Sequence, residues 1–190
     1  MSNGAPPRTL PPGTTGDEAT IDVDLRRRLT SIYEEIMWLA RRPDVTPGCA
    51  RAWYTHIMAE TVKRRLRRFT GFVSRKAVEG ESEVLRLEHF KRIQTTLSGL
   101  VSRHKTLEQP DPDDFVSVVL EHEQVHIVTF AENYAAMRAG GDYVVAGIEL
   151  VKWEALPLAR QAVLWKQMLR GKVSNAADFA SPALPPRGSL

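Results

Sequence analysis

The sequence predicts an α+β fold that is mainly helical, with about five to six helices and a small sheet of two or three strands. Apolar residues recur at three- and four-residue steps in most of the chain, the spacing of amphipathic helices. Runs of β-forming residues are few, short and scattered among these helices. The 190 residues are 43% hydrophobic and 26% charged, a composition typical of one compact domain with its own core. We expect that domain over residues 21–179.

Two ends of the chain differ from the rest in composition. Residues 1–20 and 180–190 are rich in Pro, Gly and small residues, so we expect flexible tails there. The first twenty residues lack the apolar region of a signal peptide, and no apolar run reaches bilayer length. Cys49 is the only cysteine, which excludes an intrachain disulfide. The expectation is therefore a cytoplasmic protein without a membrane partner.

The first third of the chain predicts two helices. Apolar residues recur between residues 25 and 39 after Asp22 or Asp24 as the cap, and Pro43 ends the pattern. Thr46 and Pro47 then form a cap and first turn. From there we expect one long helix that continues to about Gly71.

The middle of the chain predicts a strand, two helices and a second strand. Residues 84–87 alternate as a short strand, and residues 90–104 have helical spacing. Asp111 caps a further helix. The β-branched residues at 125–129 stiffen the chain and favour an extended strand after it.

The last third predicts a short helix, a strand and a final helix. Residues 131–139 read as a helix stopped by two glycines. Residues 143–151 are rich in β-forming residues, and Gly147 is a candidate bulge in this strand. Pro157 opens the final helix, which we expect to close at Gly171.

Charge is unevenly distributed, although the formal net charge is only +3. Residues 51–76 carry eight Lys and Arg against one Glu, whereas residues 106–137 carry seven Asp and Glu and no Lys or Arg. The candidate phosphate-binding residues are Lys63, Arg64, Arg65, Arg67, Arg68, Arg75 and Lys76. Interleaved with Phe69 and Phe72, they indicate a surface for a nucleic-acid backbone. Alternatively, some cations complement a helix dipole, or the two segments neutralise each other in the fold or across a dimer.

His122 and His126 frame the motif His-Glu-Gln-Val-His. The motif resembles the signature of zincin metalloproteases. The resemblance implies that His122 and His126 bind zinc and that Glu123 is the general base. That geometry needs a helix, because residues four apart then share one face. The β-branched residues after Gln124 favour a strand, in which the two histidines would diverge.

Glu88 and His89 form a second candidate site, at the end of a predicted strand and directly before a helix. This arrangement resembles a fragment of HNH-type endonuclease sites. The resemblance implies that His89 activates water against a metal-bound phosphate, with His104 as the distal ligand. The polar neighbours of His104 predict instead a solvated helix end.

These observations lead to one main hypothesis and two alternatives. The main hypothesis is a nucleic-acid-associated protein that binds the phosphate backbone, and catalysis is optional in it. If the protein is a metal-dependent nuclease, Glu88 and His89 are the first candidates for metal ligand and base, followed by His122 and Glu123. The first alternative is a zinc hydrolase that uses His122, His126 and Glu123. The second is a non-catalytic scaffold or homo-oligomer. The cofactor stays open, with a divalent metal ion as the candidate.

Overall fold

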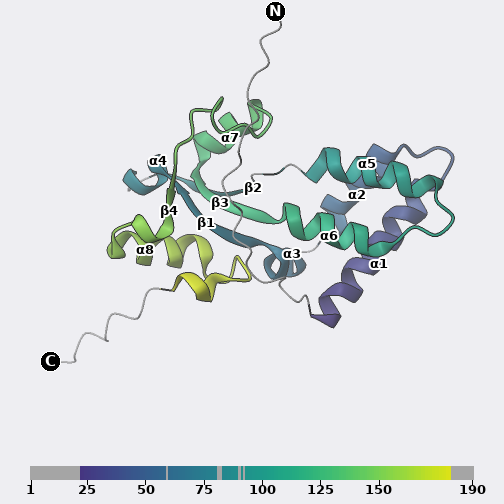
Figure 1. The fold of residues 1–190 in the computed structure, drawn as a ribbon, viewed down its shortest axis with the longest axis horizontal. Helices are drawn as coiled ribbons and strands as arrows, with labels where there is room; N and C mark the ends of the chain where they lie inside the picture. Colours follow the sequence, from purple (N-terminus) through teal and green to yellow (C-terminus); the bar gives the residue numbers. More distant parts are fainter. Residues whose placement is uncertain (1–21, 59, 81–82, 90, 92, 181–190) are drawn as a thin grey trace, which may run out of the picture.

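The computed structural model describes residues 22–58, 60–80, 83–89, 91 and 93–180. Apart from Ala180, the expected tails lie outside these residues. The helices are α1 (Val23–Ala40), α2 (Pro47–Ile57), α3 (Glu60–Leu66), α4 (Arg75–Glu79), α5 (Ile93–Thr106), α6 (Pro112–His122), α7 (Phe130–Arg138) and α8 (Leu158–Leu164). The strands are β1 (Arg68–Ser74), β2 (Leu85–His89), β3 (Gln124–Thr129) and β4 (Leu150–Lys152). Figure 1 shows a helical part formed by α1, α2, α5 and α6 beside a sheet flanked by α4, α7 and α8.

The fold class is confirmed as α+β and mainly helical. The described residues form eight α-helices and one mixed sheet of four strands, so the predicted numbers of helices and strands are too low. Strand order is β2-β3-β1-β4, with β1 parallel to β3 and the outer strands antiparallel to their neighbours. None of the described helices combines the length and apolar character needed to cross a bilayer.

The long helix expected from Thr46 to Gly71 is wrong, because it is two helices and a strand. α2 ends at Ile57, α3 ends at Leu66, and β1 follows at once. Side chains alternate along β1, so that Phe69 and Val73 are buried against the core of the sheet. Gly71 adopts a φ of 84°, in the left-handed region that glycine tolerates without strain. The apolar residues near 69–73 therefore fit a strand better than a helix.

Most of the other predicted elements are found. α1 is capped by the Asp22 carboxylate, α6 by Asp111, and the β-branched run is the strand β3. The strand expected at residues 143–151 is wrong for most of its length, because only Leu150–Lys152 pairs in the sheet. Gly147 has a φ of 65° within a turn and is not a strand bulge.

Each part of the molecule has its own apolar cluster. Phe115 lies at the centre of the helical part, and Ile127 and Trp153 belong to the cluster on the sheet. His104 is buried in the helical part, not solvated. The Tyr33 hydroxyl donates to its Nδ1 at 2.8 Å, and its Nε2 donates to the Asp114 carboxylate at 3.2 Å. These two bonds satisfy both ring nitrogens, which gives His104 a structural role in the core.

The segment after α8 binds the part of β1 that β4 does not pair with. α8 continues into a π-helical turn, η2 (Trp165–Leu169), and the chain then returns to β1. There the Asn175 side-chain amide accepts from the Phe69 N–H and donates to the Phe69 carbonyl, both at 2.9 Å. β4 pairs only with residues 72–74 of β1, so Asn175 satisfies the backbone of Phe69, which β4 does not reach.

Candidate functional site

A cavity of about 320 Å³ lies where the helical part meets the sheet. It is lined by side chains from α2, α3, β2, α5, the end of α6, and α7. Its polar lining residues include Tyr54, Lys63, Arg67, Glu88, His89, Lys91, Gln94, His122, Glu123 and Asn133. Candidate residues from three separate stretches of the sequence meet here because β3 pairs with two strands. β2 places His89 opposite Val125, and β1 places Arg68 opposite Gln124.

His89 and Glu123 form the polar centre of this cavity. The Nε2 of His89 donates to the Glu123 carboxylate at 3.0 Å. In the neutral ring this bond leaves the lone pair on Nδ1, which has no hydrogen-bond partner among the described residues. The His89 side chain is 38% exposed, whereas that of Glu123 is 6% exposed. A buried carboxylate therefore orients a histidine whose second nitrogen is free to take a proton.

Glu123 is held from a second side by Tyr54. The Tyr54 hydroxyl donates to the other carboxylate oxygen at 2.9 Å, across 69 residues of sequence. Burial raises the pKa of Glu123, but the hydrogen bonds from His89 and Tyr54 and the charge of Arg67 outweigh it, so the pKa lies below its usual range. Burial, followed by the Glu123 charge, strongly raises the pKa of Tyr54. The cavity therefore contains an ionised carboxylate beside a neutral phenol.

Positive charge lies on the wall formed by α3. The Arg67 side chain is 14% exposed and has one terminal nitrogen 3.4 Å from Glu60. Its buried Nε has no hydrogen-bond partner in the described part of the chain. Lys63 forms no ion pair with any described residue, whereas Lys91 pairs with Glu121. Lys63 and Arg67 thus offer donors to an anion in the cavity.

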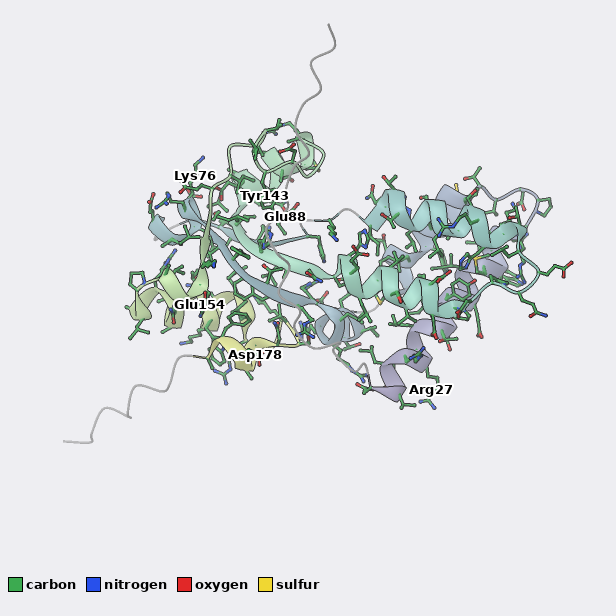
Figure 2. All side chains as sticks on the ribbon, in the orientation of Figure 1. Arg27, Lys76, Glu88, Tyr143, Glu154 and Asp178 are labelled. Carbon is green, nitrogen blue, oxygen red and sulfur yellow. The ribbon has the colours of Figure 1, made fainter. Side chains whose placement is uncertain are left out.

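The other candidate phosphate-binding residues lie outside the lining, and three are engaged in ion pairs. Arg64 is 3.6 Å from Glu60. Arg65 bonds Asp22 at 2.6 Å and Asp24 at 2.9 Å, and its hydrogen bonds lower the pKa of both carboxyls. Arg75 bonds Glu149 at 2.7 Å. Arg68 begins β1, and Lys76 lies on α4 (Figure 2). The basic segment is thus divided between two residues that line the cavity, three that form ion pairs, and Arg68 and Lys76, which do neither among the described residues.

His122 and His126 do not have the helical spacing of a zincin site, because α6 ends at His122 and β3 begins at Gln124. The Nδ1 of His122 donates to the Val118 carbonyl at 2.8 Å, and its Nε2 accepts from Thr96 at 3.2 Å. Both nitrogens of that ring are therefore engaged. His126 lies on β3 beneath other side chains, away from the cavity lining. No group of three or more His, Cys, Asp or Glu among the described residues is arranged to hold a metal ion.

Comparison of the chain with protein-family models, with curated proteins and with solved structures finds no match.

His126 belongs to a polar cluster on the sheet that lies outside the cavity lining. Thr70 donates to the Val125 carbonyl at 3.1 Å and accepts from the Nδ1 of His126 at 2.5 Å. The His126 ring packs edge-on against Phe72 and Tyr143. Burial lowers the pKa of His126 to about 4, so the ring is neutral at physiological pH.

Glu88 connects this cluster with the cavity. It is the register partner of His126 across β2 and β3, and it also lines the cavity. Burial first, and then the Glu88 charge, strongly raises the pKa of Tyr143. Figure 2 shows Glu88 and Tyr143 on the same side of the molecule, beneath α7.

Sequence reasoning does not find Tyr54, Asn133 and Met137 as lining residues. Tyr54 occupies a core position of an amphipathic helix and packs against Phe115, a pattern that indicates only burial. Asn133 and Met137 reach the cavity because α7 packs against β2 and β3. No local signal marks such contacts, since they arise from tertiary structure.

Proposed function

We propose that this protein binds a nucleic-acid backbone in the cavity between its helical part and its sheet, and cleaves a phosphodiester bond there. One observation carries the proposal. His89, oriented by the buried Glu123, shares a cavity with the cationic side chains of Lys63 and Arg67. A proton acceptor and anion-binding groups within one cavity are what phosphodiester cleavage requires.

Binding rests on the α3 wall of the cavity. Lys63 forms no ion pair with any described residue, and the buried Nε of Arg67 has an unused hydrogen. A phosphate group would give Lys63 an ionic partner beside the Arg67 guanidinium, and charge-assisted hydrogen bonds to phosphate are among the strongest that Arg and Lys form. Such contacts recognise the phosphate backbone and not the base sequence. The affinity for nucleic acid should therefore fall steeply as the salt concentration rises.

Cleavage rests on His89 as the general base. Its Nδ1 would remove a proton from a water molecule or a ribose hydroxyl while that oxygen forms the new bond to phosphorus. The bond from phosphorus to the leaving oxygen breaks, and the proton on the imidazolium passes to that oxygen or to solvent. Glu123 keeps the ring oriented and stabilises the imidazolium, as carboxylates beside catalytic histidines do.

Fluorescence anisotropy tests binding with labelled single-stranded DNA, duplex DNA and RNA over a range of salt. Cleavage is followed on gels with Mg²⁺ or with EDTA, which tests the divalent metal ion that the sequence analysis leaves open as a cofactor. We expect Lys63→Glu to weaken binding and reduce the salt slope by about one. His89→Gln should keep binding and lose cleavage.

Two control variants remove charge away from the cavity. Arg65→Ala removes an arginine that is already paired with Asp22 and Asp24, and Lys166→Glu reverses an exposed charge on η2. Both should bind almost as the native protein does. If no nucleic acid binds at low salt, or if Lys63→Glu binds as well as Lys166→Glu, the proposal is wrong. Salt-sensitive self-association without nucleic-acid affinity would favour the scaffold alternative.

A further inference from the structure

α7 carries a stripe of exposed apolar side chains. Phe130, Tyr134 and Met137 are spaced four and three residues apart, so they share one face of the helix. They are 40%, 42% and 49% exposed, respectively. The rings of Phe130 and Tyr134 contact each other edge-on, with their centroids 4.8 Å apart. Two large aromatic side chains thus form a partly exposed pair on the surface.

Positive charge accompanies this stripe. The Arg86 guanidinium, from the neighbouring strand β2, lies 5.1 Å from the centroid of the Phe130 ring. Arg138 at the end of α7 is exposed, and the one acidic residue of α7, Glu132, is buried in hydrogen bonds with Ser74 and Thr129. The exposed charge of this helix is therefore positive, which favours an anionic partner over a basic or neutral one.

The stripe leads into the cavity. Met137 belongs to both, since its side chain lines the cavity together with Asn133 one turn earlier on α7. An anion held by Lys63 and Arg67 would therefore have the α7 face as a neighbouring surface.

We propose that Phe130 and Tyr134 stack the unpaired bases of a single-stranded nucleic acid whose backbone enters the cavity. This inference rests on the proposed function and adds the strand class of the substrate. Aromatic rings flanked by arginine fit exposed bases, because each base has a π-face and each linkage has a negative phosphate. The bases of a duplex stay stacked on one another, so Phe130 and Tyr134 would not stack on them.

Three labelled ligands test the inference on the full chain: a short single strand, the same strand with abasic sites, and a duplex. The test variant is Phe130→Leu combined with Tyr134→Leu, which keeps apolar volume and removes the aromatic faces. The matched control is Trp38→Leu on α1, where an exposed Trp also lies under an arginine, at 5.5 Å from Arg42. No residue of α1 lines the cavity in the described part of the chain.

We expect the double variant to bind the single strand about tenfold or more weakly and the abasic strand unchanged, while Trp38→Leu binds both as the native protein does. A fluorescent base analogue in the strand should be quenched on binding to the native protein, which tests stacking without any substitution. Equal affinity of the native protein for normal and abasic strands would overturn the inference and leave the proposed function standing. Failure of every ligand to bind would overturn both.

Discussion

The hydroxyl of Tyr54 donates a 2.9 Å hydrogen bond to the carboxylate of Glu123 and thereby links α2 to the residue between α6 and β3. Tyr54 also packs against Phe115 at the centre of the helical core, with ring centroids 6.1 Å apart. The same tyrosine is therefore a core residue and the second support of the cavity carboxylate. Substitutions of Tyr54 should therefore affect both the stability of the protein and the orientation of the Glu123 carboxylate.

Tyr54→Phe should destabilise the protein by about 1.5–3 kcal/mol. The substitution keeps the ring and its packing but removes a buried hydrogen bond to an ionised group. Urea denaturation measures the free energy of unfolding. The control is Tyr134→Phe, where the hydroxyl lies on a half-exposed side chain and the change should stay within about 0.5 kcal/mol. Equal effects of the two variants would contradict the role of Tyr54.

Glu123→Gln should separate cleavage from binding. The amide has the shape of the carboxylate but no charge to stabilise a His89 imidazolium, so we expect cleavage to slow by at least about 100-fold. Affinity for nucleic acid should stay close to the native value, because Lys63 and Arg67 remain. Single-turnover cleavage on gels and anisotropy measure the two quantities. A variant that cleaves at the native rate would remove Glu123 from the mechanism.

Acid should weaken the fold through His126. Its pKa in the folded protein is about 4, below the ordinary 6.5, so the unfolded chain binds the proton more readily. The neutral His126 ring makes its whole contribution to the free energy of unfolding above pH 6.5, and this contribution is lost as the pH falls toward 4. The expected loss is about 3 kcal/mol. Urea denaturation across this range should show the decline, and His126→Gln should flatten it. If the free energy of unfolding of the variant falls with pH as steeply as that of the native protein, the decline is due to titratable groups other than His126.

Two glycine substitutions should change stability in opposite directions. Gly71→Ala in β1 places a side chain at a φ of 84°, which should destabilise the protein by about 1–2 kcal/mol. A Cβ at Gly99 on α5 has open space within 4 Å beyond its chain neighbours and the backbone of its own helix, so Gly99→Ala should stabilise the protein by about 0.5–1 kcal/mol. Thermal denaturation measures both. Destabilisation by Gly99→Ala would show that the space beside α5 is not open.

The sequence predicts the elements that depend on local signals. Asp22 and Asp111 act as caps, and the β-branched residues after Gln124 form the strand that separates His122 from His126. The sequence does not predict β1, because its apolar residues fit a helical spacing as well as a strand spacing. Only tertiary pairing with β3 and β4 decides between the two.

The candidate site is predictable in its parts and not in its assembly. Glu88, His89 and Glu123 stand out as chemical residue types, but their meeting depends on β2 pairing antiparallel with β3. The pairing of Arg65 with Asp22 across 43 residues likewise has no local signal, so the sequence overstates the free positive charge.

The amide of Asn175 has a consequence for how the chain is made. It bonds the backbone of Phe69 from 106 residues away, where β4 does not pair with β1. During synthesis, β1 leaves the ribosome long before this partner. Until residue 175 has emerged, the backbone of Phe69 lacks its partner on that side and is open to strands from neighbouring nascent chains.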